Sequence, residues 1–230
     1  VKRLPATLMD INHRLQDVNY SYEIIVVSDG SIDATGEVVK RLSDIIGNLK
    51  LIENKENHGK GWVVRQGMLE ATGEWRLFMD ADNSTSIDQF NNMLPFLKGG
   101  YDVVVGSRAV HGAKLMPAQS WCRQLFGRLG NLIIQFLVLP GIQDSQCGFK
   151  CFRGEVAQKV FSFTRINGWG FDIEALALAK KFGFKIKEMP VTWVNDSRSS
   201  VKMSSYFQTL GEVFKIRWWL WLNKYKIKNQ

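Results

Sequence analysis

Two aspartates one residue apart, Asp80 and Asp82, are the residues of this chain best suited to chemistry. They follow the apolar run 75–79 and precede the polar segment 83–85, so they stand where a strand is expected to end. Two carboxylates so placed can share a divalent cation with a diphosphate, because Mg²⁺ is typically held by one or two carboxylates plus substrate phosphates. The alternative is a turn that caps the next helix. The pair alone does not decide between these two interpretations.

Polar residues also follow the neighbouring apolar runs. Four runs are expected to be strands: 22–27, 49–53, 74–79 and 101–105. Helical patterns lie between them, at 33–46, 61–71 and about 87–97. This alternation predicts an α/β fold with a mainly parallel sheet and helices on both faces. Ligands bind at the carboxyl ends of the strands in such sheets, so we expect Asp29, Asp80, Asp82 and Arg108 to line one edge.

The alternation breaks down after Gly106. The remaining elements are expected to be a helix at about 119–139, a loop at 141–148, a strand near 149–152, a helix to 161, a helix at 171–182, a strand at 185–194 and a helix at 204–226. No internal repeat or low-complexity linker interrupts them. We therefore expect the 230 residues to form a single domain.

Composition limits the class of protein. A content of 45% hydrophobic and 23% charged residues predicts a globular chain, and its net charge of +8 favours anionic partners: nucleic acid, a phosphorylated substrate or an acidic membrane surface. The longest apolar stretch, 132–139, falls short of the ~18 residues that span a bilayer, and no signal-peptide pattern opens the chain. Three cysteines without a CxxC pair predict a reduced cytosolic setting with neither disulfide nor zinc.

The C-terminal segment is rich in aromatic residues. Three tryptophans lie within 217–222, and Lys224, Lys226 and Lys228 follow, which is typical of an interfacial membrane helix. The alternative is a helix that buries one face through residues at helical spacing: Tyr206, Leu210, Val213, Phe214, Trp218 and Trp221. Trp219, Leu220 and Leu222 lie off that stripe, which favours lipid contact. The helix at 125–139 is a second candidate for lipid contact.

Five segments together resemble a known family. They are 26–33 (VVSDGSID), 57–61 (NHGKG), 79–82 (MDAD), 106–108 (GSR) and 144–150 (DSQCGFK). In this order they resemble family 2 glycosyltransferases of the GT-A fold, in the branch that transfers a sugar from a nucleotide diphosphate to dolichyl or polyprenyl phosphate. The run 143–150 looks more like the dolichyl-phosphate glucosyltransferases than the mannosyltransferases.

The resemblance implies an inverting hexosyltransferase with a nucleotide-sugar donor, UDP-glucose favoured over GDP-mannose, and Mg²⁺ or Mn²⁺ as cofactor. It also implies peripheral binding to the cytoplasmic face of a membrane and no nucleic-acid partner. Residues 1–110 would form the nucleotide-sugar-binding half, 111–203 the acceptor-binding half, and 204–230 an amphipathic membrane-associating helix.

The same resemblance assigns roles to individual residues. The metal ligands would be Asp80 and Asp82, and the catalytic residues Asp82 and Asp144. The nucleotide sugar would contact Asp29, Lys60, Asp80, Ala81 and Asp82. The acceptor phosphate would contact Arg108, Arg123, Arg198 and Lys202, while Gln146, Lys150 and Glu174 would support the sugar or acceptor.

Structural alternatives remain open for several of these assignments. Asp29 suits a helix cap, Lys60 a simple junction between loop and helix, and Asp144 a loop-stabilising role. A single arginine or lysine is more often a solvated surface charge. The acceptor itself needs positioning cations rather than a general base, because a phosphate monoester has a second pKa near ~6 and is largely dianionic at neutral pH.

Two departures from the family pattern stand out. The family usually opens with a strand that ends in a Pro-x-Tyr-Asn-Glu-like loop, whereas this sequence begins with the helical pattern expected to follow that strand. The expectation is therefore a sheet that lacks its first strand, which would weaken both the stability of the fold and the binding of the donor. Ser28 also stands where the family often has a second aspartate, which leaves Asp29 available.

Three other functions remain as alternatives. One is a GDP-mannose-dependent polyprenyl-phosphate mannosyltransferase. Another is a polysaccharide-elongating family 2 transferase, which needs a catalytic base for its hydroxyl acceptor. The third is a non-catalytic basic membrane-binding module.

Overall fold

The N-terminal part of the computed structural model, which describes residues 3–116, 121–194 and 203–227, is a small α/β unit. It contains α1 (Leu4–Leu15), β1 (Ile24–Asp29), α2 (Thr35–Ser43) and β2 (Leu49–Asn54). Pro5 lies in the first turn of α1, where a missing N–H breaks no helical hydrogen bond. β1 and β2 pair in parallel, so Asp29 and Asn54 end them at the same edge. Leu8, Val39, Ile46 and Leu49 form the local core.

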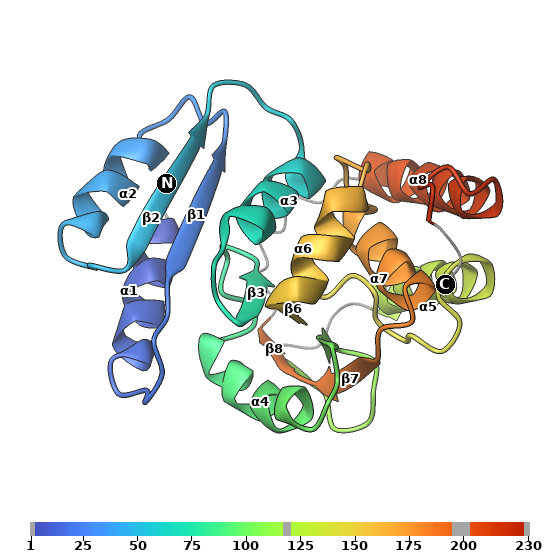
Figure 1. Ribbon diagram of the computed structural model, residues 1–230, viewed down its shortest axis with the longest axis horizontal. Helices are drawn as coiled ribbons and strands as arrows, with labels where there is room; N and C mark the ends of the chain where they lie inside the picture. The colour runs from blue at the N-terminus through green and yellow to red at the C-terminus, as the bar shows by residue number, and fades with distance from the viewer. Residues whose placement is uncertain (1–2, 117–120, 195–202, 228–230) are drawn as a thin grey trace.

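A four-stranded sheet occupies the centre of the molecule, with the strand order β3–β6–β4–β7 (Figure 1). Its strands are β3 (Trp75–Met79), β6 (Phe149–Arg153), β4 (Val103–Ser107) and β7 (Ile186–Pro190). β4 and β7 are parallel, whereas β6 runs antiparallel to both of its neighbours. The antiparallel direction brings the start of β6 to the end of β3, where the backbone N–H of Asp80 donates to the carbonyl of Gly148 over 3.0 Å.

Helices cover both faces of this sheet. On one face, β4 and β6 place Val103, Val105 and Phe152 against α6 (Gly154–Phe163) and α7 (Phe171–Lys181). On the other face, Val104 and Cys151 pack against α4 (Phe90–Lys98), which follows the 3₁₀ turn Ile87–Gln89. This alternation follows from the two-residue period of a strand. The predicted sandwich of a sheet between helices is confirmed.

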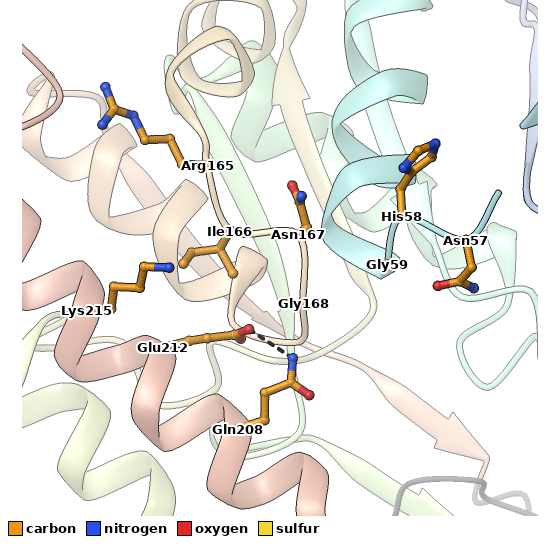
Figure 2. A pocket seen from close by; sticks show the side chains of 10 residues that line it. All are labelled: Asn57, His58, Gly59, Arg165, Ile166, Asn167, Gly168, Gln208, Glu212 and Lys215. Carbon is orange, nitrogen blue, oxygen red and sulfur yellow. Dashed lines mark hydrogen bonds between the residues drawn. The ribbon is translucent and has the colours of Figure 1, made fainter.

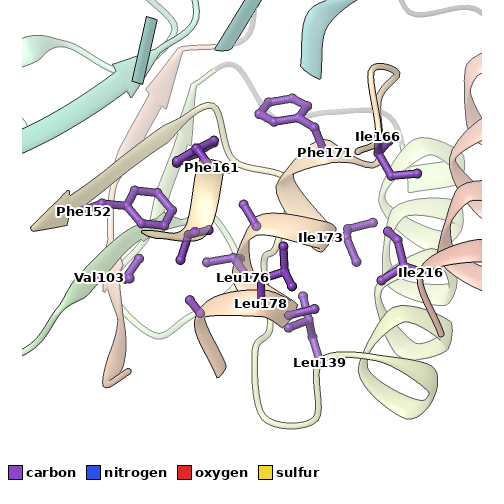
Figure 3. Close-up of a cluster of buried hydrophobic side chains, with 14 of the residues drawn as sticks. Val103, Leu139, Phe152, Phe161, Ile166, Phe171, Ile173, Leu176, Leu178 and Ile216 are labelled. Carbon is purple, nitrogen blue, oxygen red and sulfur yellow. The ribbon is translucent and has the colours of Figure 1, made fainter. Parts of the chain in front are cut away.

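The largest core surrounds α7, which is buried from Phe171 to Ala179 (Figure 3). A helix that is apolar all round belongs inside a domain. α3 (Lys60–Glu70), α6 and α8 (Met203–Trp221) pack against α7, and α5 (Trp121–Leu137) packs against α8. This core fixes the first turn of α7, which carries Asp172 and Glu174, relative to the strand ends.

The strands differ from the sequence prediction in two respects. First, they form three separate sheets: the β1–β2 pair, the central sheet, and a parallel pair of β5 (Lys114–Met116) and β8 (Thr192–Val194). Second, the strand predicted at 185–194 breaks after Pro190, whose ring lacks the N–H that a ladder needs. The short β5 strand has no clear period-two pattern, and the sequence did not predict it.

The sheets are interrupted between β1 and β3. Among the described strands, the edge of β1 away from β2 and the edge of β3 away from β6 have no partner. Figure 1 shows the β1–β2 unit set apart from the central sheet, with α3 between them. The expectation of a sheet without its first strand stays a prediction.

The C-terminal helix exposes a different face from the one expected of a packed helix. Val213 and Ile216 are buried, whereas Phe214, Trp218 and Trp221 are more than half exposed. The alternative in which the predicted stripe buries one face is therefore wrong. Trp219 and Leu220, which lie off that stripe, pack against the core.

α8 is also shorter than predicted: it ends at Trp221, and Asn223 just beyond it adopts a positive φ of 47°. Within the described residues, no helix has the length and hydropathy needed to cross a membrane.

Candidate active site

The loop after β3 presents two carboxylates to solvent. Asp82 Oδ1 accepts a hydrogen bond from the Ser84 N–H over 3.0 Å, so the turn considered as an alternative is present, but it does not cap the 3₁₀ helix that begins at Ile87. Asp80 Oδ1 accepts one from Lys60 Nζ over 2.6 Å. The second oxygens of Asp80 and Asp82 make no hydrogen bond with any residue that the structure describes.

Helix α1 fixes this loop from its outer side. The Thr7 hydroxyl donates to the carbonyl of Ala81 over 3.0 Å, and the Asn83 side-chain amide donates to Asp10 Oδ2 over 2.8 Å. Asn83 adopts a φ of 57°, a left-handed conformation that asparagine tolerates better than most residues. Sequence reasoning missed Thr7 and Asp10, because nothing in their local pattern links them to a loop more than 70 residues away.

The donor set fits a hard divalent cation. Two carboxylates supply oxygens, which are the ligands that Mg²⁺ and Mn²⁺ prefer. Gly148 leaves room for the Asp80 carboxylate, because a Cβ at this position would lie 2.1 Å from Asp80 Oδ2. Across the described part of the chain, no group of three or more His, Cys, Asp or Glu side chains could hold a metal by itself. A cation at Asp80 and Asp82 would therefore need further ligands from a bound diphosphate.

Lys60 connects the loop before α3 to Asp80. Burial by itself would lower the pKa of Lys60, but the charges of Asp80 and Asp172 outweigh this and raise it above the usual value. The ammonium group also lies 5.4 Å from the centre of the Trp169 ring. Lys60 thus stays cationic beside the candidate metal ligands. A residue that only joined a loop to a helix would not need this ion pair with Asp80.

Asp29 holds the same loop from the end of β1. Its Oδ1 accepts the N–H of His58 over 2.7 Å, and its Oδ2 accepts the N–H of Gly59 over 2.9 Å. The N–H of Thr35 at the start of α2 donates to Asp33 and not to Asp29, so the helix-cap alternative for Asp29 is wrong. The strand ends of β1 and β3 are therefore linked through Asp29, the loop before α3 and Lys60, although the two strands belong to separate sheets and not to the single sheet edge that was predicted.

Arg108 and Asp144 form a paired site beyond the end of β4. Arg108 Nε donates to Asp144 Oδ2 over 2.7 Å, Arg108 Nη2 donates to Oδ1 over 2.9 Å, and the Arg108 backbone N–H also donates to Oδ2. The Asp144 side chain is only 3% exposed, against 28% for Arg108. Burial alone would raise the pKa of Asp144, but the charge and hydrogen bonds of Arg108 lower it below the usual value.

This pairing makes Asp144 a residue that orients Arg108, in line with the loop-stabilising alternative. Glu188 supports the same loop from β7, because its two carboxylate oxygens accept the backbone N–H groups of Gln143 and Asp144. Gln146 is half-buried, and its backbone N–H donates to Asp144 Oδ1 over 3.3 Å. Sequence reasoning missed Glu188; the signal was an acidic residue inside an apolar strand.

Lys150 and Glu174 lie behind the site and have no exposed surface. Lys150 Nζ donates to Asp172 Oδ1 over 2.6 Å and to the carbonyl of Cys147 over 2.5 Å. Glu174 accepts the backbone N–H groups of Arg165 and Ile166 and the hydroxyl of Tyr225. In this arrangement neither residue can touch a ligand, so any support that they give to a sugar or acceptor is indirect.

The remaining predicted cations are not placed by the structure. Arg198 and Lys202 lie outside the described residues, and Arg123 lies in α5 with its side chain outside them. The predicted acceptor group is thus represented by Arg108 alone.

A recess of about 400 Å³ opens beside the loop that precedes α3. Its walls come from that loop, from the segment before α7 and from α8, as Figure 2 shows. The lining residues are Asn57, His58, Gly59, Arg165, Ile166, Asn167, Gly168, Gln208, Glu212 and Lys215.

Comparison with known proteins agrees with this geometry. Residues 2–161 match the family model described as glycosyl transferase family 2. The chain belongs to this family. As a family 2 glycosyltransferase it resembles the dolichyl-phosphate beta-glucosyltransferase of Dictyostelium discoideum, with 34% identity over 99% of this chain and 73% of that protein. The human dolichyl-phosphate beta-glucosyltransferase is 32% identical over 94% of this chain and 71% of its own length. The predicted resemblance is therefore confirmed.

Solved structures confirm the predicted GT-A fold. The mannosyltransferase PcManGT from Pyrobaculum calidifontis, in complex with GDP-Man and Mn²⁺, has a TM-score of 0.65 and 18% identity. The match covers 93% of this chain and 59% of PcManGT. The glucosyl-3-phosphoglycerate synthase from Mycobacterium tuberculosis, in complex with Mn²⁺ and UDP-glucose, has a TM-score of 0.64 and 17% identity, over 94% of this chain and 74% of that one.

Proposed function

We propose that this glycosyltransferase transfers glucose from UDP-glucose to dolichyl phosphate, with inversion at the anomeric carbon. The observation that carries the proposal is the contrast between the accessible carboxylates of Asp80, whose side chain is 36% exposed, and Asp82, which is exposed, and the buried Asp144 paired with Arg108. The first pair suits a diphosphate with its cation, whereas Asp144, buried and paired with Arg108, is not free to act as a base for a hydroxyl acceptor. The names of the 34% and 32% identical relatives support the same donor sugar and acceptor.

Asp80 and Asp82 would hold Mg²⁺ or Mn²⁺, which neutralises the diphosphate leaving group as the anomeric bond breaks. Lys60 adds a second positive charge at Asp80, within reach of a donor phosphate. Asp29 and the loop that it holds before α3 would form the side of the site for the nucleotide base. Structures with GDP-mannose and with UDP-glucose share this fold, so the fold leaves the choice of donor to experiment.

Arg108 would position the acceptor phosphate, and Asp144 holds the guanidinium group in place for it. A phosphate monoester with a second pKa near ~6 is already a nucleophile at neutral pH. One of its oxygens would bond to the anomeric carbon while the bond from that carbon to the UDP oxygen breaks. No proton has to be removed, so a buried and ion-paired Asp144 is compatible with catalysis.

The exposed apolar faces of α5 and α8 support a membrane location for the acceptor. On α8 the exposed residues Phe207, Phe214, Trp218 and Trp221 recur at helical spacing, and Lys215 and Arg217 border them. On α5 the exposed residues Leu129, Leu132 and Phe136 form a similar stripe. The two helices pack together at the end of the molecule away from β1 and β2 (Figure 1). Aromatic and basic residues on one face suit a peripheral contact with anionic lipid, here the cytoplasmic face of a membrane.

The test is a transfer assay with the purified protein, Mn²⁺ and a short-chain polyprenyl phosphate in lipid vesicles. We expect glucose transfer from UDP-glucose, a β-linked product, and no transfer from GDP-mannose. Transfer from GDP-mannose alone would overturn the donor assignment. Transfer to a free saccharide but not to the polyprenyl phosphate would overturn the acceptor assignment.

Binding to vesicles with and without anionic lipid tests the membrane contact separately. We expect the double variant Trp218→Ser/Trp221→Ser to lose most of the vesicle-bound fraction. The control Trp75→Phe changes an aromatic residue in β3, away from α8. Equal vesicle binding by the double variant and the wild type would exclude the α8 surface.

A further inference from the structure

The helix with the exposed aromatic stripe also reaches the site through its opposite side. Glu212 lies about half a helical turn away from Phe214, Trp218 and Trp221. Glu212 Oε2 accepts the backbone N–H of Gly170 over 2.6 Å, and Gln208 Nε2 donates to Glu212 Oε1 over 3.1 Å. Figure 2 shows Glu212 and Gln208 directed toward the segment that carries Gly168.

Two glycines make room for this carboxylate. A Cβ at position 168 would lie 2.2 Å from Glu212 Oε1, and one at position 170 would lie 2.9 Å from Oε2. Real Cβ atoms do not approach other atoms so closely, and a side chain at either glycine would push Glu212 away. The segment 165–170 is therefore shaped to receive Glu212 from α8.

The other end of the same segment is fixed from α7 and lies against the start of α3. Glu174 accepts the N–H groups of Arg165 and Ile166, each over 2.8 Å. The carbonyl of Asn167 accepts the N–H of Gly61 over 2.8 Å. A Cβ at Gly59 would lie 2.5 Å from the Asn167 carbonyl oxygen, so the two segments are in close contact at this point.

The start of α3 is the part of the chain that links the two proposed donor-binding strand ends. The Gly59 N–H donates to Asp29, and Lys60 donates to Asp80. A continuous path of direct contacts thus runs from Glu212 through the segment 165–170 to Asp29 and Asp80. Each step is a hydrogen bond or a close backbone approach, and none of them depends on Arg108 or Asp144.

We propose that Glu212 is a positioning residue for the nucleotide sugar. It holds the segment 165–170 against the loop at 57–61, and that loop sets the positions of Lys60 and Asp29. In this role Glu212 acts through the segment 165–170, so its loss should change donor affinity rather than the chemical step. This role rests on the proposed donor site.

The kinetic test uses two variants of Glu212 and one control. Glu212→Ala removes the acceptor of the Gly170 N–H, and we expect the KM for UDP-glucose to rise about tenfold with kcat within about twofold. Glu212→Gln keeps a side-chain oxygen for Gly170 and should restore KM to within about threefold of wild type. Glu155→Ala is the matched control, because this glutamate in α6 is 80% exposed. A fall in kcat with unchanged KM in Glu212→Ala would overturn the proposal.

Two measurements that do not depend on turnover complete the test. Calorimetry with UDP and Mn²⁺ should show about tenfold weaker binding to Glu212→Ala than to wild type. Amide hydrogen exchange without ligands should be faster at 57–61 in Glu212→Ala and unchanged in Glu155→Ala. If Glu212→Ala binds UDP with the same affinity as the wild type, the positioning role is overturned and the donor assignment stands. If the wild-type protein does not bind UDP in the presence of Mn²⁺, the donor assignment is overturned. The hydrogen-exchange data would then decide whether Glu212 positions the loop.

Discussion

At the end of β3, Asp80 and Asp82 lie at the surface with two oxygens unengaged by described residues, whereas beyond the end of β4 Asp144 is buried beneath Arg108. Both regions gather carboxylates at the same sheet edge, but solvent access differs between them. An exposed carboxylate can accept a cation from solution, while a buried one requires a cation built into the chain. The contrast separates a place for an exchangeable metal ion from a place where a fixed guanidinium group is oriented.

Lys150 and Asp172 form a further ion pair of the buried kind, in which a carboxylate is matched by a cation from the chain itself, and this pair lies in the core. Both side chains are almost fully buried, at 0% and 6% exposed. Lys150 lies in β6, which pairs with β3 and β4, so this ion pair supports both strand ends from behind. The comparison therefore predicts that substitutions at Asp80 and Asp82 lower activity. Substitutions in the buried pairs should instead lower stability or disturb the orientation of Arg108.

The largest expected effect is at Asp82. Asp82→Ala removes an exposed oxygen donor, and transfer activity should fall about 10³-fold because a catalytic cation contributes several kcal/mol to stabilising the leaving group. Activity measured across a Mn²⁺ titration checks this. Asp17→Asn, at an exposed position between α1 and β1, is the control. Full metal-dependent activity in Asp82→Ala would show that the cation is held elsewhere.

The next effect is on stability. Lys150→Met leaves Asp172 without its ion-pair partner in the core, and the free energy of unfolding should fall by about 3 to 5 kcal/mol. Chemical denaturation gives this value, with Lys181→Met at the exposed end of α7 as the control. The double variant Lys150→Met/Asp172→Leu should recover most of the loss. A stability loss as small as that of the control would mean that the pair does not support the core.

Asp144→Asn should lower kcat/KM for the acceptor about 100-fold, because Arg108 loses the charge that orients it. The KM for UDP-glucose should change by less than about threefold. Steady-state kinetics with each substrate varied in turn separate the two effects. An equal loss for donor and acceptor would contradict the division between the two regions.

The smallest expected effect is that of pH. The acceptor rate should fall about fourfold between pH 7 and pH 5.5, as a phosphate with a second pKa near ~6 gains a proton. Asp144 does not cause this fall, because its pKa is lowered and it stays ionised well below pH 5.5. The stability that its pair with Arg108 provides is present above the usual aspartate pKa and is lost only as pH falls through the lowered value. A pH–rate profile that shifts in Asp144→Asn would instead identify Asp144 as a base.

The sequence predicted which residues belong to the site, but it did not predict the contacts among them. It placed Asp29, Asp80, Asp82 and Arg108 at strand ends, because apolar runs followed by polar residues have a local signature. It did not predict that Asp29 would hold the loop before α3, or that Asp144 would be paired with Arg108. Such pairings join residues 29 to 36 positions apart, and no local sequence period indicates them.

The exposed face of α8 shows the same limit. A helical repeat indicates which residues share a face, but several apolar faces were available along this helix. Packing against α7 and α5 chose Val213 and Ile216 for the core and left Trp218 and Trp221 outside. The neighbouring helices made that choice, because the core has room for only one face of α8.

The sequence by itself determined most of the order of strands and helices, though not β5 or the break after Pro190, together with the family and the carboxylate pair at the end of β3. Tertiary structure alone decided that β6 runs antiparallel, that Lys150 is buried with Asp172, and that Glu212 reaches Gly170. The physical reason is the range of the interactions involved. Backbone propensity and side-chain period act over a few residues, whereas strand pairing, ion-pair burial and close packing depend on which distant segments meet in the folded chain.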